Sequence, residues 1–237
     1  MKTAIVTGGT RGIGKEISLA LLQRGYRVAA VYRSNDGAAE ALRQEAEKLG
    51  HCPLIIRADL SENAECIRVA AEVKKSFGFV SLLVNNAATE LWSLYQSVTD
   101  SRMTELFSVN LFAAMRLTRE LLPDMIERGK GSIVNVASIW GEVGGSCEVH
   151  YSASKAAIIG FTKALSKEVG ISGVRVNAIS PAATQTEMLA RFSEEEFSRI
   201  AEESPLGRLL TAKEVADAAV YLAESSALNG TVLNIGY

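Results

Sequence analysis

Seven short runs rich in valine and isoleucine recur along the chain and alternate with longer stretches of helical periodicity. The runs cover residues 3–7, 26–32, 53–58, 80–85, 132–137, 174–179 and 231–235. Continuous apolar runs of this length are typical of strands that are buried on both faces. Between them, apolar residues recur every three or four positions, as at Ala38, Leu42 and Ala46. This spacing predicts amphipathic helices.

The order of these elements decides the fold class. Strands joined by helical crossovers form a parallel sheet, because right-handed crossovers place helices over both of its faces. No proline-, glycine- or serine-rich linker and no internal repeat interrupts the alternation. We therefore expect an α/β protein: a single doubly wound Rossmann-type domain over residues 1–237, with a seven-stranded parallel sheet and helices on both faces.

Basic and acidic residues are spread along the whole chain and nearly cancel. The sequence has 25 basic and 27 acidic residues, giving a formal net charge of -2. No basic cluster predicts binding to nucleic acid or to an anionic membrane, so a small molecule is the expected partner. Residues 1–6 lack the long apolar segment of a secretory signal, and no later run is apolar enough to span a bilayer. We expect a cytoplasmic protein.

The cysteines and histidines do not have the spacing of a metal site. The three cysteines, Cys52, Cys66 and Cys147, lie far apart, and the chain has two histidines. Zinc ligands usually come as closely spaced pairs. We expect no metal and no disulfide. For Cys147 we favour a packing role over a reactive thiol.

A glycine-rich turn follows the first predicted strand and leads into a helix. Residues 7–14 read TGGTRGIG. Gly8 allows a tight turn, Gly12 lets backbone approach a pyrophosphate, and Gly14 lets helix and strand pack closely. Glycines also serve strand-to-helix turns that bind nothing. In this position we expect a dinucleotide to bind, with contacts from Gly8, Thr10, Arg11, Gly12, Ile13 and Gly14.

The end of the second predicted strand indicates which dinucleotide binds. NAD sites usually carry Asp or Glu there to hydrogen-bond the ribose 2′-hydroxyl. This chain has Tyr32, Arg33 and Ser34 instead. Arg33 can bind a 2′-phosphate through charge-assisted hydrogen bonds, with Ser34 adding a hydroxyl and Arg11 closing from the other side. A solvated strand-end charge is the alternative for Arg33. We expect NADP(H) as the cofactor.

Tyr151 and Lys155 lie one helical turn apart and therefore on the same helix face. A phenol with a pKa near ~10 is a poor acid-base catalyst at neutral pH, and a neighbouring ammonium lowers that pKa. Ser138, just beyond the fifth strand, can hydrogen-bond a substrate oxygen from the same end of the sheet. In isolation, a Tyr and a Lys at this spacing would more often be surface residues. Together the three predict proton transfer.

A long irregular segment follows the sixth strand. Residues 180–210 contain Pro181 and Pro205 around a polar helical stretch at 194–203. Open α/β sheets bind ligands at the carboxyl ends of their strands, where this segment begins. We interpret residues 181–210 as a substrate lid, with a plain surface excursion as the alternative.

With these motifs in order, the chain resembles the short-chain dehydrogenase/reductase family over nearly its whole length. The resemblance rests on the glycine turn, Asn85-Asn86-Ala87, Ser138, and Tyr151 with Lys155. Within the family it is most similar to the 3-oxoacyl-[acyl-carrier-protein] reductase branch, through residues 7–14, 151–156 and 174–177. Ala88 and Ala182 stand where the family often has glycine.

The resemblance implies roles for individual residues. Tyr151 is the proton donor or acceptor, Lys155 holds the nicotinamide ribose and lowers the tyrosine pKa, and Ser138 positions the carbonyl. Asn110 matches an asparagine that holds a relay water; helix-interior polarity is the alternative. The remaining matches are cofactor contacts: Asp59 and Leu60 beside the adenine, Asn86 and Ala87 near the central sheet, Pro181 at the nicotinamide, and Thr186 near its carboxamide.

The implied activity is NADPH-dependent reduction of a carbonyl to a hydroxyl, on a 3-oxoacyl group carried by acyl-carrier protein. Reduction of another small carbonyl or a sugar, or a catalytically silent NADP-binding sensor or scaffold, are the alternatives. Arg128 and Lys130 would dock the acidic carrier, whereas Ser172 stands where that branch often has Arg. The expected pocket walls are apolar: Trp92, Trp140, Val143, Cys147, Met188 and Phe192. Apolar residues on several faces of 101–128 and 151–170 predict a homotetramer, with a dimer as the alternative.

Overall fold

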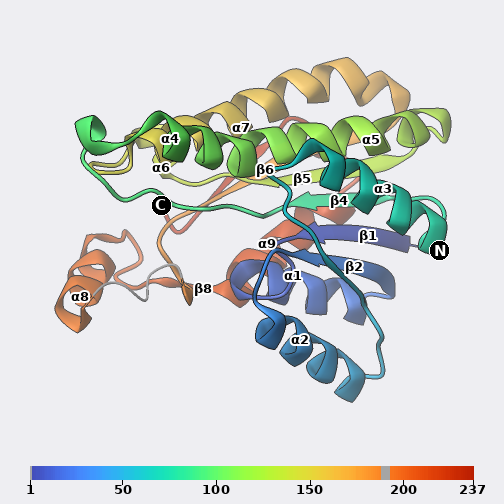
Figure 1. Ribbon diagram of the computed structural model, residues 1–237, viewed down its shortest axis with the longest axis horizontal. Coiled ribbons are helices and arrows are strands. Elements are labelled where there is room, and N and C mark those ends of the chain that lie inside the picture. Colours follow the sequence, from blue (N-terminus) through green and yellow to red (C-terminus); the bar gives the residue numbers. More distant parts are fainter. Residues whose placement is uncertain (1, 188–192) are drawn as a thin grey trace.

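The computed structural model describes residues 2–187 and 193–237, which form a sheet covered by helices on both faces (Figure 1). Seven strands pair in the order β3-β2-β1-β4-β5-β6-β9, and every pair is parallel. The strands are β1 (Lys2–Thr7), β2 (Tyr26–Tyr32), β3 (Leu54–Arg57), β4 (Leu82–Asn85), β5 (Gly131–Val136), β6 (Val174–Pro181) and β9 (Val232–Ile235). The predicted fold class and all seven predicted strands are confirmed.

Two separate cores lie on the two faces of the sheet. On one face α1 (Gly12–Gln23), α2 (Asp36–Lys48) and α9 (Ala212–Glu224) pack against side chains such as Val6. On the other, α3 (Asn63–Phe77), α5 (Ala113–Glu127) and α7 (Val149–Val169) pack against side chains such as Ile5. Successive strand residues point to opposite faces, so strands β1 to β6 contribute to both cores. This burial on both faces explains the continuous apolar runs.

The helix expected over residues 101–128 is interrupted. It consists of α4 (Asp100–Phe107), a π-helical turn, η2 (Ser108–Phe112), and then α5. Such turns insert a residue into the helix and are frequent at functional sites. An i, i+4 pattern of apolar residues does not reveal the inserted residue, so the sequence predicted one regular helix.

The two ends of the segment that follows β6 lie next to each other. Two short strands, β7 (Thr184–Gln185) and β8 (Leu210–Thr211), pair side by side, and α8 (Glu194–Glu203) lies between them in sequence. Thr211 then starts α9 with a capping box, in which Thr211 and Glu214 hydrogen-bond each other's backbone N–H. Figure 1 shows α8 projecting beyond the body of the sheet.

The remaining elements are short. They are the 3₁₀ turns η1 (Tyr95–Ser97) and η3 (Gly170–Ser172), and α6 (Trp140–Val143). Within the described part of the chain, no helix is both long and apolar enough to cross a membrane.

Candidate active site

The carboxyl ends of β1 and β4 meet at the switch point of the sheet, where the strand order reverses direction. The glycine-rich turn leaves β1 at this point. Gly8 and Gly12 adopt φ values of 61° and 50°, which favour glycine. A side chain at Gly14 would collide with the carbonyl oxygen of Gly8 and with the amide of Asn86. The turn therefore needs these glycines for its conformation and for close packing.

Thr7 and Asn86 fasten the glycine turn to the end of β4. The Thr7 hydroxyl accepts hydrogen bonds from the backbone N–H groups of Asn86 and Ala87, both at 2.9 Å. The Asn86 amide donates to the carbonyls of Thr7 and Gly8, at 2.9 and 3.2 Å. Sequence analysis expected Asn86 and Ala87 here but missed Thr7. A hydroxyl at the last position of the strand was the available signal.

The start of α1 suits an anionic phosphate. Arg11 is the N-cap, no side chain caps the helix, and the first turn holds no acidic residue. Backbone N–H groups at a helix start and the helix dipole attract negative charge. Thr10 is buried and Ile13 packs against the core, so Ile13 offers its backbone alone to a ligand. The residues present therefore fit a dinucleotide pyrophosphate.

Thr186 lies over the same turn. A Cβ placed on Gly12 would be 3.4 Å from the Thr186 methyl carbon. The neighbouring Glu187 forms an ion pair of 2.9 Å with Arg11, across 176 residues of sequence. The structure thus brings the predicted Thr186 and Arg11 to one side of the glycine turn.

Arg33 and Ser34 lie exposed beyond the end of β2. The Arg33 guanidinium faces Glu105 of α4 at 3.5 Å. Its backbone carbonyl accepts a hydrogen bond of 3.2 Å from Arg57, at the end of β3. Arg57 is a second guanidinium at this end of the sheet, and sequence analysis missed it. Its place at the end of a strand adjacent to β2 was the signal.

Asp59 and Leu60 occupy the turn between β3 and α3. The Asp59 carboxylate accepts a hydrogen bond of 3.0 Å from the backbone N–H of Ser61, and Leu60 is buried. The turn is therefore held by Asp59 itself. Ala58 N–H donates to Tyr32 O at 2.8 Å, so this turn adjoins the Arg33 end of β2.

Tyr151, Lys155 and Ser138 come together at the carboxyl end of β5. Tyr151 and Lys155 lie buried on α7, and Ser138 follows β5. The Ser138 hydroxyl lies close enough to Tyr151 to act on the pKa of its phenol. The Lys155 ammonium lies 5.6 Å from the centre of the Tyr151 ring and donates to the carbonyl of Val136 at 2.8 Å. The three predicted catalytic residues form one cluster.

Gly141 allows this cluster to form. A Cβ at Gly141 would lie 2.7 Å from the Lys155 carbonyl carbon and 2.9 Å from Ala156 N. Real Cβ atoms do not approach backbone this closely, so α6 reaches α7 only because residue 141 is glycine. The approach places Ser138 next to Tyr151.

Burial controls the two pKa values in the cluster. It raises the pKa of Tyr151 strongly, with the nearby carboxylates of Glu148 and Glu90 adding to the rise and the Ser138 hydroxyl opposing it. Burial also lowers the pKa of Lys155 to about 8. Desolvation disfavours the charged form of each group. The expected lowering of the phenol pKa by Lys155 stays a prediction.

Glu148 and Glu90 were not expected at the site. Glu148 is a buried N-cap residue of α7, three positions before Tyr151. Both carboxylates lie close enough to Tyr151 to disfavour its phenolate. Glu148 is close in sequence to Tyr151 and Glu90 follows the Asn85-Asn86-Ala87 stretch, so proximity to recognised motifs was the signal.

Asn110 joins the π-helical turn to two neighbours. Its amide exchanges two hydrogen bonds with the backbone of Thr89, at 2.8 and 2.9 Å, and donates a third to Ser154 at 3.1 Å. These bonds tie the segment after β4 to α7. Asn110 therefore lies beside the cluster, with its side chain engaged by protein groups.

Pro181 ends β6 next to the catalytic loop. Its carbonyl accepts a hydrogen bond of 3.1 Å from the backbone N–H of Ile139, next to Ser138. Ala182 and Ala88 both have negative φ, since Cys147, at 61°, is the one non-glycine residue with positive φ in the described parts of the chain. The two alanines therefore impose no left-handed strain.

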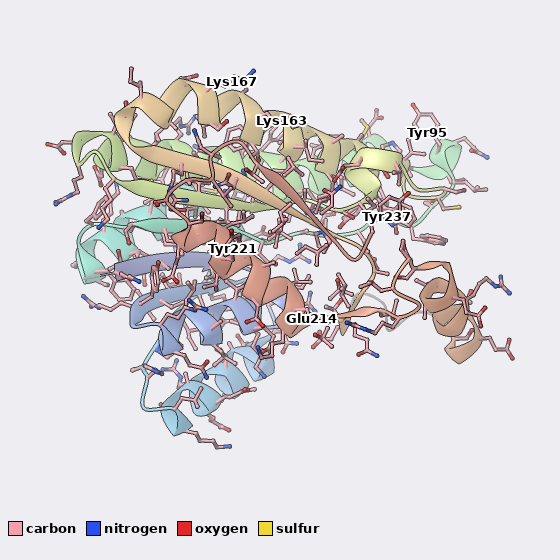
Figure 2. The ribbon with its side chains drawn as sticks, turned by 180° about the vertical axis from the view of Figure 1, so that it is seen from behind. Tyr95, Lys163, Lys167, Glu214, Tyr221 and Tyr237 are labelled. Carbon is pink, nitrogen blue, oxygen red and sulfur yellow. The ribbon has the colours of Figure 1, made fainter. Side chains whose placement is uncertain are left out.

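Four of the six residues expected to line the substrate pocket belong to the described part of the chain. Trp92, Trp140 and Val143 are exposed, and Cys147 is half-buried. Met188 and Phe192 lie outside the described residues. Figure 2 shows Tyr95 and Tyr237 at the same end of the molecule as α8. Tyr95 stacks on His150, the neighbour of Tyr151, with ring centres 5.2 Å apart.

Arg128 and Lys130 do not lie at this edge. They come directly before β5, whereas Ser138 comes directly after it. In a parallel sheet all strands enter from one edge and leave from the other. The two basic residues therefore lie at the amino edge, opposite the edge that carries Ser138, and their docking of an acidic carrier stays a prediction.

The chain is similar to known proteins over nearly its whole length. The family model of the short chain dehydrogenases matches residues 2–197. An uncharacterized oxidoreductase of Bacillus subtilis, YmfI, is 38% identical over 237 residues, covering 99% of this chain and 97% of its own. An acetoacetyl-CoA reductase of Rhizobium meliloti is 39% identical over 227 residues, covering 95% and 92%. A 3-oxoacyl-[acyl-carrier-protein] reductase of Bos taurus is 38% identical over 232 residues, covering 98% and 95%.

Proposed function

The chain belongs to the short-chain dehydrogenase family, and we propose that within it the protein is an NADPH-dependent reductase that converts the 3-oxo group of an acyl thioester to a hydroxyl. One observation carries the proposal. Tyr151 and Lys155 lie buried on one face of α7, and the Ser138 hydroxyl lies close enough to Tyr151 to act on the pKa of its phenol. A neutral acid beside an oxygen-binding hydroxyl is what carbonyl reduction requires.

The mechanism follows from these three side chains. Ser138 and Tyr151 hydrogen-bond the substrate carbonyl oxygen and polarise it. Tyr151 then donates its proton to that oxygen, and its raised pKa keeps the proton in place until negative charge develops there. Lys155 stabilises the resulting phenolate and holds the nicotinamide ribose. Bound NADPH supplies the hydride that reduces the carbonyl carbon.

Arg33 supports the preference for NADPH. No carboxylate occupies the strand-end positions 33 and 34, where an NAD site has its ribose acceptor. Arg57 adds a second positive charge beside it, with its Nε 3.2 Å from Arg33 O. A doubly charged 2′-phosphate gains more from two nearby guanidiniums than a hydroxyl does. Glu105 competes for Arg33 and moderates the gain.

The proposed substrate class comes from the relatives and the site rim. An acetoacetyl group is a short 3-oxoacyl group. The names of the acetoacetyl-CoA reductase and the 3-oxoacyl-[acyl-carrier-protein] reductase therefore specify the same reacting group on two different carriers. Exposed Trp92, Trp140 and Val143 offer apolar surface for an acyl chain beside Tyr151. The proposed substrate is therefore a 3-oxoacyl thioester, and a comparison of the two carriers, coenzyme A and acyl-carrier protein, decides between them.

We also propose a homotetramer. Phe112, Met115 and Ile126 are exposed on the outer side of the π-helical turn and α5, and Phe161 of α7 lines the same groove. An exposed apolar groove of this kind is typical of a surface that pairs with another subunit. Figure 2 shows Lys163 and Lys167 on the outward side of α7, which limits the apolar face to the α5 side of that helix.

A substrate panel with NADPH tests the proposal. We expect acetoacetyl-CoA and acetoacetyl-acyl-carrier protein to oxidise NADPH, and sugars, steroids and quinones to react far more slowly. Comparing the two thioesters at equal concentration identifies the carrier. Tyr151→Phe serves as the control, because it retains the fold and lacks the proton. NADPH binding without turnover of any carbonyl would instead indicate a silent sensor or scaffold.

A further inference from the structure

A small cavity lies directly behind Lys155. Its walls come from β1, β4, β5, the π-helical turn with the start of α5, and α7, and they include Asn85, Asn110, Val136 and Lys155. Its volume is about 10 Å³, which is room for one water molecule. Lys155 contributes the one charged side chain of this wall.

A chain of buried hydrogen bonds determines how the Asn85 amide is oriented. The Thr162 hydroxyl donates to the carbonyl of Ile158 at 2.8 Å, so it accepts from the Asn135 amide nitrogen, also at 2.8 Å. The Asn135 oxygen then accepts from the Asn85 amide nitrogen at 2.8 Å. Each hydrogen bond fixes which end of the next amide, nitrogen or oxygen, faces its partner. The nitrogen of Asn85 therefore faces β5, and its oxygen is left as an acceptor.

That oxygen has no hydrogen-bond partner among the described residues. Asn85 is 7% exposed, and Oδ1 is fully buried. A buried acceptor without a donor costs about 1–3 kcal/mol, so such atoms are normally paired. The side chain of Asn110, by contrast, makes three hydrogen bonds to protein groups. Of the two amide side chains that line the cavity, Asn85 is thus the one whose oxygen can still accept a hydrogen bond.

We propose that Asn85 is a positioning residue for Lys155: its Oδ1 accepts a hydrogen bond from a water molecule in this cavity, and the water accepts one from the Lys155 ammonium. The ammonium has three donors, and Val136 O takes one of them at 2.8 Å. The water takes the second, which leaves the third for the cofactor ribose. The role in catalysis rests on the proposed function, whereas the water site does not.

The consequence is control of the charge on Lys155. The water, held by the Asn85 carbonyl, stabilises the ammonium against the desolvation that lowers its pKa to about 8. The titratable group that faces Lys155 is Tyr151, on the same helix. The other elements of the wall contribute uncharged side chains: Thr7, Asn85, Ala87, Val109, Asn110, Ala113, Ala114 and Val136. No charged neighbour in this wall therefore masks the effect of the water.

A high-resolution crystal structure of the unliganded protein gives the first test. We expect an ordered water within hydrogen-bond distance of both Asn85 Oδ1 and Lys155 Nζ. An empty cavity, or a water that reaches only one of the two atoms, overturns the proposal. This result does not depend on any activity, so it stands apart from the test of the proposed function.

The second test compares Asn85→Leu with Asn177→Leu. Asn177 is fully buried in β6, where it also makes hydrogen bonds to backbone, but it does not line the cavity. Both exchanges remove a buried amide, so both lower stability. We expect Asn85→Leu alone to lower the Lys155 pKa by about one unit, as measured by NMR titration of labelled lysine, because one hydrogen bond to a charged group is lost.

The alkaline limb of the kcat profile should move to lower pH by the same amount in Asn85→Leu. An unchanged Lys155 pKa in that variant, or an equal shift in Asn177→Leu, contradicts the proposal. Should Asn85→Leu fail to fold, the crystal structure of the unmodified protein decides the matter.

Discussion

The Lys155 ammonium lies 5.6 Å from the centre of the Tyr151 ring and gives its hydrogen bond to the carbonyl of Val136. That hydrogen bond goes to the backbone of β5, and burial governs the pKa values of both side chains.

Tyr151→Phe should abolish turnover and leave NADPH affinity nearly unchanged, because only the transferable proton is removed. Initial rates and a fluorescence titration with NADPH measure the two effects. Lys155→Ala should impair both, since the same ammonium serves ribose and phenol. Turnover of Tyr151→Phe within a few-fold of the unmodified enzyme would show that another group supplies the proton.

Stability should rise with pH between about 8 and 10.5 because of Lys155. The folded-state pKa is depressed from 10.5, so the unfolded chain binds more protons in this window, and raising the pH favours folding. The total gain is on the order of 3 kcal/mol, since one pKa unit corresponds to about 1.4 kcal/mol. Urea unfolding across this range measures the slope, which Lys155→Met should remove. Tyr151, with its raised pKa, acts in the opposite direction above pH 10.

Arg33→Ala should weaken NADPH binding by about ten- to hundred-fold and barely affect NADH, because only NADPH carries the 2′-phosphate. Glu105→Gln should strengthen NADPH binding by a few-fold, since it removes the carboxylate 3.5 Å from Arg33. Both effects should shrink with added salt, because these side chains are exposed. Dissociation constants for the two cofactors decide the question. Equal weakening toward both in Arg33→Ala would make Arg33 a structural residue.

Gly141→Ala should lower kcat by roughly tenfold or more with little change in NADPH affinity. The added methyl forces α6 away from α7, because it would otherwise lie 2.7 Å from the Lys155 carbonyl carbon. Ser138 then moves relative to Tyr151, and small misplacements of catalytic groups are costly. Steady-state kinetics and cofactor titration provide the measurement. Unchanged kcat would indicate that the loop accommodates the methyl without moving Ser138.

Light scattering at micromolar concentration should report a particle about four times the 25.4 kDa chain mass. Met115→Glu should reduce this mass, because it places a charge on the exposed apolar groove of α5 and α7. Glu127→Lys, at the end of α5, is a charge-changing control outside the residues that line that groove. A 25.4 kDa species alone would refute the assembly.

The sheet and the catalytic cluster were predictable from sequence for different reasons. Strands such as β1 and β6 are recognised because burial on both faces demands a continuous apolar run. Tyr151 and Lys155 are recognised because helix geometry alone places them on one face. Neither inference requires knowledge of distant contacts.

Other features depend on residues far apart in sequence. Asn85, Asn135 and Thr162 form one hydrogen-bonded chain, but 50 and 27 residues separate its successive members. The two-residue strands β7 and β8 carry no pattern of their own. The depressed Lys155 pKa and the raised Tyr151 pKa follow from the depth at which α7 is buried, which no local motif encodes. The position of Arg128 and Lys130 at the amino edge follows from the direction of β5 in the sheet, which their local sequence does not show.

The pairing of β7 with β8 makes the segment between them a loop whose two ends are joined by hydrogen bonds. Thr184 is opposite Leu210 and Gln185 is opposite Thr211, so the chain returns to the point it left before α9 begins. Arg208 then binds Glu214 through two hydrogen bonds of 2.6 and 3.0 Å, which secures the return end to α9. Because loop-closure entropy changes slowly with length, residues between these fixed ends can be lengthened, shortened or exchanged at small cost to folding. Under the proposed function, changes in this segment would alter substrate preference and leave the glycine-rich turn and Tyr151 in place.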